Sequence, residues 1–331
     1  MDDAGTERTN GHPWKGVAVL ASTLRDWGTE GFAVLDGAQF ENLPDALLST
    51  DLRARGLYRD RGDNTSVDYE RTMPQLLPLS GSETARTFGN GRSSDTIDRI
   101  LELIGTRPAA VFWRCPAGQE ALYRHLRRIN RVLYPSEERE LSGDEGEATS
   151  EAVTFRHSDA NVLAQVLPAF DTGTRSRLFG PATMIAFRPE AVWCDAPEHV
   201  EESAGEGGTV LSARGGLEID VQTVKRIEAV HRIGAITAYL RDTNPTLTRP
   251  IPVHRLRRKV REWTADGLSR SMQKERTLWK WNYLNLISDG AIAQREDVRE
   301  FLQGRYARWT VEEGVDALME GAIEDLREAD L

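Results

Sequence analysis

The hydrophobic pattern of the chain changes at one glycine-rich stretch, and this change limits the folds that are open to it. Up to about residue 195, short apolar runs typical of strands alternate with segments of helical periodicity, whereas only helical periodicity follows residue 218. Five glycines between residues 205 and 216 separate the two patterns. We therefore predict an α+β fold with two lobes. The N-terminal lobe is α/β-like, with a mixed sheet and flanking helices, and the C-terminal lobe is all-helical.

The same pattern predicts four segments along the 331 residues: a flexible N-terminus (1–15), the α/β lobe (16–205), a glycine-rich linker (206–217) and the helical lobe (218–331). Apolar residues make up 39% of the chain and charged residues 28%, which is typical of globular proteins. No apolar run approaches the ~20 residues needed to cross a bilayer, and the first fifteen residues lack the apolar core of a secretory signal. We therefore expect a cytoplasmic protein that does not enter the membrane.

Individual elements of the N-terminal lobe can be predicted from periodicity and turn residues. Helices are predicted over residues 17–27, 95–104, 119–132 and 158–167, and strands over 31–37, 74–79, 109–115, 152–156, 178–187 and 191–194. The strand at 74–79 contains Pro74 and Pro78, which favour the edge of a sheet. The acidic stretch 136–150 lacks apolar periodicity and is predicted as a solvated loop.

The C-terminal lobe is predicted as a series of helices over residues 224–240, 256–263, 278–287, 298–302 and 310–326. The last of these has the clearest start, because Thr310 and Glu313 form the pattern of a capping box. An apolar stripe follows at helical spacing, which indicates that this helix packs along one face.

The sequence lacks the usual patterns of a catalytic or metal centre. None of the six histidines lies three or four residues from another histidine or a cysteine, and Cys115 and Cys194 are far apart, which is typical of buried thiols rather than a disulfide or a metal knuckle. The one local cluster of reactive side chains is 156–159, Arg-His-Ser-Asp. We interpret it as a strand end followed by Ser158 or Asp159 capping a helix. We expect no enzyme activity, no cofactor and no metal.

Basic and aromatic residues alternate in the stretch 254–283, although the chain as a whole carries a net charge of −10. Candidate partner-binding residues in this stretch are Arg255, Arg257, Arg258, Arg261, Trp263, Arg270, Trp279, Trp281 and Tyr283. Arginine, tryptophan and tyrosine dominate protein interfaces, whereas basic charge with aromatic rings also suits nucleic acid. A third interpretation is structural, with the apolar residues in a core and the arginines on its solvated face. The sequence pI of about 5.3 argues against nucleic acid.

Several short segments, taken in order, resemble the effector adaptor or chaperone family of type VI secretion systems, long described only as a domain of unknown function. The segments are 32–38, 57–58, 74–79, 111–113 leading to 122–127, 153–156 with 162–163, and 178–181, and 289–302 is similar to the family's closing helical region. The resemblance covers residues 17–195, about half of the chain. It assigns structural roles to Asp36, Gly37, Phe155, Arg156, Asp159, Phe179, Gly180 and Pro181.

The chain departs from the family at one motif. Family members tend to have Asp-Pro-Arg near the fourth strand, and here Asp159 is kept while Ala160 and Asn161 replace the other two residues. The Asp36-Gly37 pair suggests a turn in which the carboxylate accepts backbone N–H groups.

The resemblance implies a non-enzymatic adaptor. Such proteins bind a toxic effector in the producing cell, keep it soluble and help to load it onto the VgrG spike or its PAAR tip. We expect a groove between helices, lined by Trp263, Trp279, Trp281 and Tyr283, to bind the effector. The alternative is a nucleic-acid-binding protein that uses the basic helices of 254–283.

Overall fold

The computed structural model describes residues 14–58, 71–80, 96–135, 150–195, 199–202, 217–302 and 309–329. Two compact units make up the chain: unit 1 contains Met1–Glu190 and Pro197–Ile227, and unit 2 contains Ala191–Ala196 and Glu228–Leu331. The predicted flexible N-terminus, acidic loop and glycine-rich linker lie outside the described residues, except at their ends. The boundary between the units falls inside a helix at residues 227–228 rather than in the predicted linker.

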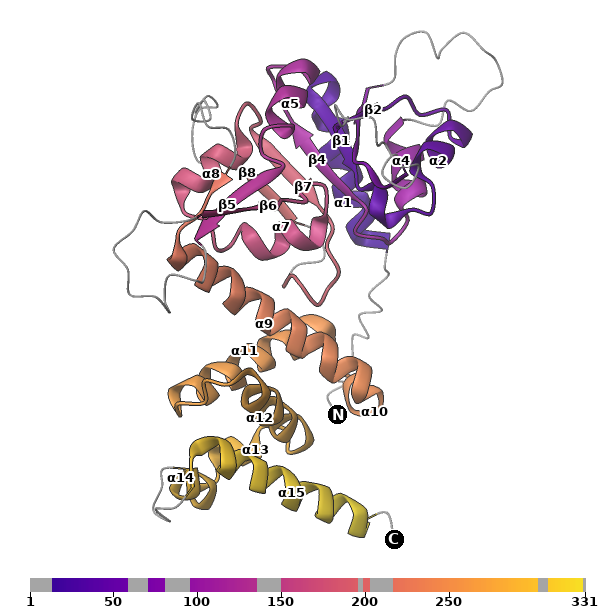
Figure 1. The fold of residues 1–331 in the computed structure, drawn as a ribbon. Helices are drawn as coiled ribbons and strands as arrows, with labels where there is room; N and C mark the ends of the chain where they lie inside the picture. Colours follow the sequence, from indigo (N-terminus) through magenta and orange to yellow (C-terminus); the bar gives the residue numbers. More distant parts are fainter. Residues whose placement is uncertain are drawn as a thin grey trace, which may run out of the picture. The chain divides into compact units, whose positions relative to one another are not determined.

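Unit 1 contains a six-stranded antiparallel sheet with the strand order β2-β3-β1-β4-β7-β8 (Figure 1). Its strands are β1 (Gly31–Leu35), β2 (Arg55–Gly56), β3 (Gln75–Pro78), β4 (Ala110–Arg114), β7 (Met184–Phe187) and β8 (His199–Glu202). All five residues of β1 are buried, which explains its continuous apolar sequence. The register places Ala33 opposite Leu77 on one side and Phe112 on the other.

A second sheet in unit 1 has the order β6-β5-β9, with β5 (Arg131–Pro135), β6 (Ser150–Thr154) and β9 (Leu217–Glu218). The pair β5/β6 is antiparallel and the pair β5/β9 is parallel, so the lobe contains a mixed sheet. This confirms the predicted α+β class for the N-terminal lobe.

Helices cover the larger sheet and close its core. They are α1 (Trp14–Asp26), α2 (Leu43–Ser49), α4 (Thr96–Ile104), α5 (Gln119–Leu126), α7 (Ala160–Val166) and α8 (Thr172–Phe179), together with the short 3-10 helices η1 (Gly28–Glu30) and η2 (Gly37–Gln39). Leu24 of α1 and Ile100 of α4 are fully buried in one cluster with Leu35 of β1. Because side chains alternate across a strand, Val34 and Trp113 face the opposite side of the sheet. There the rings of Trp113 and His157 meet edge-to-face, with 6.4 Å between their centroids.

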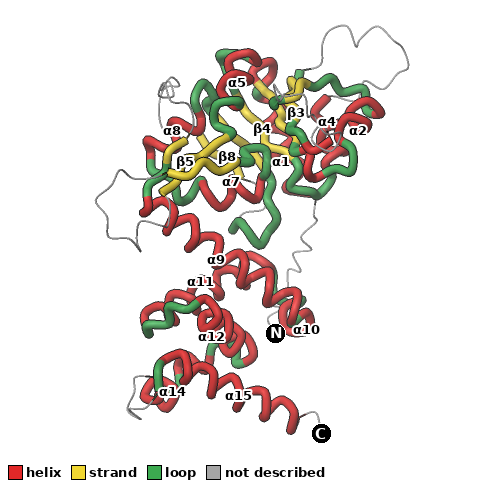
Figure 2. The backbone as a smooth tube through the Cα atoms, in the orientation of Figure 1, coloured by secondary structure: helices red, strands yellow, loops and turns green. Residues whose placement is uncertain are grey.

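Unit 2 is helical in all its described elements, as Figure 2 shows. Its helices are α9 (Val221–Thr243, whose first residues belong to unit 1), α10 (Pro245–Thr248), α11 (Val253–Ser269), α12 (Glu275–Ile287), α13 (Ala291–Gln294), α14 (Glu296–Leu302) and α15 (Val311–Ala329). Leu256 and Val260 of α11 pack against Ile236 of α9, and Trp281 of α12 packs against Val315 of α15. The all-helical C-terminal lobe is thus confirmed.

The predicted capping box at the start of α15 is present. The backbone N–H of Glu313 donates to Thr310 Oγ1 at 3.3 Å, and the Glu313 carboxylate accepts the backbone N–H of Thr310 at 2.7 Å. Among the described residues, no helix combines the length and the apolar character that a membrane span requires.

Four sequence predictions for the N-terminal lobe (16–205) are wrong. The helix predicted over 119–132 ends at Leu126, and residues 131–135 form β5, because pairing with β6 overrides the apolar spacing of that stretch. The first part of the strand predicted over 178–187 is the end of α8, which stops at Gly180 with φ +54°. Residues 191–194 form a turn rather than a strand.

The fourth error concerns 74–79, which is an inner strand. The two-residue strand β2 pairs with Gln75 and Leu76, while β1 pairs along the other side of β3. The prolines stand just before the strand and at its last residue, so the N–H groups between them are free to pair. Of the two cysteines, Cys115 is buried as predicted and Cys194 is only half-buried.

Candidate functional site

A groove of about 730 Å³ opens between three helices of unit 2. Each helix contributes a pair of side chains four residues apart: Tyr239 and Thr243 from α9, Trp279 and Tyr283 from α12, and Met319 and Ile323 from α15. Asn244, Glu275, Arg276 and Lys280 complete the lining. Because residues four apart lie on the same side of a helix, the three pairs form ridges that face the same space.

Aromatic contacts fix the shape of the groove. The rings of Tyr239 and Trp279 meet edge-to-face with 4.6 Å between their centroids. The indole N–H of Trp279 donates to the Glu275 carboxylate at 3.3 Å. The indole is therefore held by a ring contact and by a hydrogen bond, and it remains half-buried rather than buried.

The two cations that line the groove differ in whether they form an ion pair. Lys280 forms an ion pair with Asp316 at 2.5 Å, one turn before the Met319 and Ile323 ridge of α15. Arg276 is exposed and makes no ion pair with another described residue. The groove thus combines apolar side chains with an arginine that forms no ion pair with a described residue, and with the Glu275 carboxylate, which is bonded to the neutral Trp279 indole.

Two of the four tryptophan and tyrosine residues predicted to line a groove lie in it, namely Trp279 and Tyr283. Trp281 is fully buried in the core and Trp263 is nearly so. At 100° per residue, Trp281 points to the opposite side of α12 from Trp279, which explains why neighbours in sequence have different surroundings. Trp263 and Trp281 are core residues.

Arg257 and Arg261, both predicted to contact a partner, form ion pairs within unit 2. The Arg257 guanidinium is only 6% exposed, and it donates to Asp195 at 2.9 Å and to the carbonyl oxygen of Val192 at 2.7 Å. Arg261 donates to the other oxygen of Asp195 at 2.5 Å. Burial alone would raise the pKa of Asp195, but the hydrogen bond from Arg261 and the two positive charges outweigh it and lower that pKa.

The segment 191–195 therefore belongs to the packing of the helical unit. Trp193 stacks on His231 of α9 with 5.3 Å between ring centroids. It also lies against Gly234, where an added Cβ would stand 2.2 Å from the indole ring. The glycine allows this close approach of the indole to the helix.

The remaining predicted arginines fall into two groups. Arg270 pairs with Asp266 at 2.8 Å and lies over the Trp281 ring, 5.3 Å from its centroid. Arg255 and Arg258 are exposed, lie outside the groove lining and make no ion pair with the described residues.

Eight of the ten residues that line the groove were not among the predicted partner-binding residues, and Tyr239, Met319 and Ile323 are the largest apolar ones of these. Tyr239 lies in the predicted helix 224–240, one position before the apolar Leu240. Met319 and Ile323 lie in the predicted helix 310–326 and follow directly after Leu318 and Ala322, which belong to its apolar stripe. The sequence feature that could have identified them is the width of the apolar face of these helices, which exceeds what packing in the core requires.

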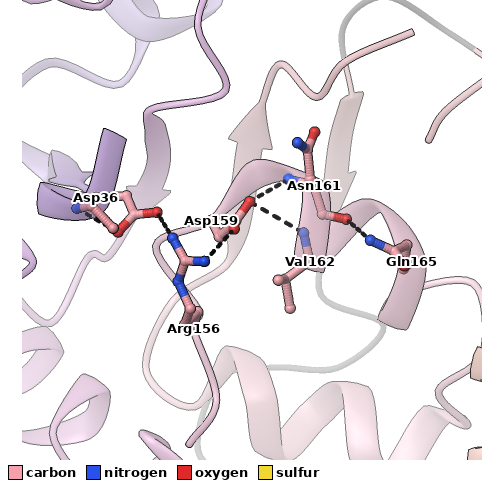
Figure 3. Close-up of polar contacts among 7 residues, drawn as sticks. Asp36, Arg156, Asp159, Asn161, Val162 and Gln165 are labelled. Carbon is pink, nitrogen blue, oxygen red and sulfur yellow. Dashed lines mark hydrogen bonds and ion pairs between the residues drawn. The ribbon is translucent and has the colours of Figure 1, made fainter. Parts of the chain in front are cut away.

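A second polar cluster, in unit 1, connects the turn after β1 with the start of α7 (Figure 3). The Asp36 side chain is only 2% exposed, accepts the Ala38 N–H at 3.3 Å and binds the guanidinium of Arg156 at 2.5 Å. Arg156 also lies 3.3 Å from Asp159. Burial raises the pKa of Asp36 although Arg156 opposes this shift.

The two carboxylates of this second cluster, Asp36 and Asp159, bind backbone N–H groups and Arg156, which is a structural role. Asp159 accepts the backbone N–H groups of Asn161 at 2.8 Å and Val162 at 3.4 Å, which confirms the predicted helix cap. The Asp36 turn is likewise confirmed. Arg156 bridges the two carboxylates and thereby joins two segments that are far apart in sequence.

His157 and Ser158, next to this cluster, are not arranged as a nucleophile and its base. His157 is fully buried, its Nε2 lies 2.5 Å from the Tyr58 hydroxyl, and burial lowers its pKa to about 3. The Ser158 hydroxyl has no hydrogen-bond partner among the described residues. The described residues also contain no group of His, Cys, Asp and Glu side chains that could hold a metal ion.

The other motif residues of unit 1 serve packing. Phe155 and Phe179 are buried. At Gly180 an added Cβ would stand 2.3 Å from the His125 ring, and at Gly37 it would stand 2.5 Å from the backbone of Thr72. Pro181 follows Gly180, and its carbonyl oxygen accepts the Cys115 thiol at 3.6 Å.

Comparison with known proteins gives a match to a family model. No curated protein and no solved structure matched the chain. Residues 31–177, which run from β1 into α8, match the model of a family described as Domain of unknown function (DUF4123). Residues 31–177 are thus similar to a family whose function is unknown.

Proposed function

We propose that this protein is a non-enzymatic adaptor that binds a type VI secretion effector in the cytoplasm and helps to load it onto the VgrG or PAAR spike. Two findings support the adaptor family. The resemblance of residues 17–195 to such adaptors overlaps the family match at 31–177, and the motif residues Asp36, Gly180 and Asp159 occupy structural positions.

The groove of unit 2 is the observation that carries the proposal. Its aromatic side chains present apolar area with few rotatable bonds, which lowers the entropy lost on binding. Tryptophan, tyrosine and arginine are also the residues that contribute most to protein interfaces. A protein segment that buried Trp279, Tyr239 and Tyr283 would gain apolar contact with a groove whose shape is formed before the partner binds.

The ion pairs of unit 2 favour a protein partner over nucleic acid. Arg257, Arg261 and Arg270 are neutralised by Asp195 and Asp266. Their charges are therefore less available for the phosphate contacts on which nucleic-acid affinity depends.

Affinity purification of the tagged full chain from secreting cells tests the proposal. The lysate is treated with nuclease, and the retained proteins are identified by mass spectrometry. We expect one effector to be retained, with or without the spike protein, and its secretion to stop when the adaptor is deleted. Recovery of nuclease-sensitive nucleic acid alone, or normal effector secretion without the adaptor, would contradict the proposal.

A further inference from the structure

We infer that the groove of unit 2 binds a helical segment of its partner, apolar along one side and carrying a carboxylate that pairs with Arg276. The identity of the protein that carries the segment rests on the proposed function. The chemistry of the segment follows from the walls of the groove.

The helical conformation follows from the ridges that face the groove. All three walls present side chains at positions i and i+4: Tyr239 and Thr243, Trp279 and Tyr283, Met319 and Ile323. Rows of this spacing interlock with the same rows on another helix, which is the commonest mode of helix packing. The open face between α9, α12 and α15 therefore suits one more helix.

An extended segment would fit these walls poorly. The walls are helices, whose central N–H and C=O groups already bond within each helix. A strand in the groove would find no sheet edge to pair with and would bury unsatisfied backbone groups. A helix satisfies its own backbone and needs only side-chain contacts.

The length of the groove sets the size of the recognised segment. The lining of α12 runs from Glu275 to Tyr283, which corresponds to about 12 Å at a rise of 1.5 Å per residue. This length accommodates about two turns of helix. The segment should therefore carry apolar side chains at i and i+4, with a third at i+7 or i+8.

The charge of the segment follows from the one unmatched cation. Glu275 accepts the Trp279 indole N–H, and Lys280 pairs with Asp316. Arg276 is left without an ion pair among the described residues, next to an apolar surface that a partner would desolvate. A carboxylate on the flank of the helix would pair with it, whereas a cation there would be repelled.

Photo-crosslinking in secreting cells tests the segment directly. The photoreactive residue p-benzoylphenylalanine replaces Tyr239 or Tyr283 in the full chain, and a control carries it at Leu268, on the neighbouring helix α11. Tyr239 and Leu268 are equally exposed, at 44%. We expect crosslinks from both groove positions, and none from Leu268, to one stretch of a partner protein with apolar residues at i and i+4 and an Asp or Glu on its flank.

Several outcomes would overturn the inference: a crosslinked stretch without this pattern, a crosslink to a second copy of this chain, equal yield at Leu268, or no protein crosslink at either groove position. If an effector is retained but crosslinks only outside the groove, the inference fails and the proposed function survives. If the crosslinked stretch has the pattern but belongs to a protein that is not secreted, the inference survives and the proposed function fails.

Charge reversal tests the role of Arg276. We expect Arg276→Glu to lower the amount of retained partner about tenfold, since the carboxylate then meets a like charge. Arg258→Glu, at an exposed arginine outside the groove, should leave retention within about twofold of wild type. Replacing the partner's carboxylate by lysine should restore binding to Arg276→Glu. Equal losses in the two arginine variants, or no restoration, would refute the pairing.

Discussion

Replacing Asp195 by alanine tests whether Arg257 and Arg261 stabilise the helical unit. In the structure, Asp195 is the shared acceptor of both guanidinium groups, at 2.9 Å from Arg257 and 2.5 Å from Arg261. The substitution leaves the Arg257 charge buried, with the Val192 carbonyl oxygen as its remaining hydrogen-bond acceptor among the described residues. We therefore expect Asp195→Ala to destabilise unit 2.

The exposures of the side chains set the size of this effect. Removing one partner of a fully buried ion pair costs about 3–5 kcal/mol, and a hydrogen bond to a charged group contributes about 1.5–3 kcal/mol. Arg257 is 6% exposed but Asp195 is 53% exposed, so water can reach part of the vacated space. We expect a loss of about 2 kcal/mol for Asp195→Ala. Arg261→Ala, at a 48% exposed side chain, should cost less than about 1 kcal/mol.

The measurement is urea unfolding followed by circular dichroism, with hydrogen exchange of the α11 amides to localise the change. A double-mutant cycle adds Arg257→Met, which keeps the length of the side chain and removes its charge. We expect the double variant to be about 1 kcal/mol more stable than the sum of the single effects predicts, because no buried charge is then left unpaired.

Two results would refute this account of Asp195. One is additivity of the two substitutions, and the other is a change of less than about 0.5 kcal/mol in Asp195→Ala together with loss of the retained partner. If the account holds, charge reversal at Arg257 or Arg261 is unsuitable as a test of partner binding, because it would act through folding.

Three further predictions concern single sites. Gly180→Ala should lower the melting temperature by several degrees, because a Cβ there meets the His125 ring and the backbone has φ +54°; an unchanged melting curve would contradict this. The low pKa of His157, about 3 in the fold against about 6.5 unfolded, means that its contribution to stability is complete above pH 6.5 and is lost as the pH falls toward 3. Urea unfolding at pH 7 and pH 5 should therefore show a loss that is smaller in His157→Gln, and equal losses would refute this. Thr310→Ala should destabilise α15 by about 1 kcal/mol, measured by hydrogen exchange of its first turn, and unchanged exchange there would refute the role of the capping box with Glu313.

Local sequence patterns predicted the elements whose conformation depends mainly on interactions between residues close in sequence. The helix over 95–104 has apolar residues on one side, and the structure has α4 at Thr96–Ile104 with Ile97, Ile100 and Ile104 buried. The start of α15 could be predicted because Thr310 and Glu313 bond to each other within one turn.

Elements that depend on distant partners could not be predicted in the same way. The residues after Leu126 continue a helical spacing, but β6 pairs with 131–135 and makes them a strand. Arg257 and Asp195 are 62 residues apart, so no local pattern connects them. Similarly, the difference between Trp279 and Trp281 depends on which side of α12 meets α15, and this is set by packing.

The most direct test of the central claim compares two tryptophans of unit 2. Trp279 lines the groove, whereas Trp309 is 55% exposed, lies outside the groove lining and meets Phe301 edge-to-face. Trp279→Ala and Trp309→Ala are purified from secreting cells under identical conditions, and the retained partner is quantified by mass spectrometry. If the groove binds the effector, Trp279→Ala should lower the amount of retained effector at least about tenfold while Trp309→Ala keeps it, since aromatic residues buried at an interface contribute most to binding. Equal retention by the two variants, both folded by circular dichroism, would contradict it.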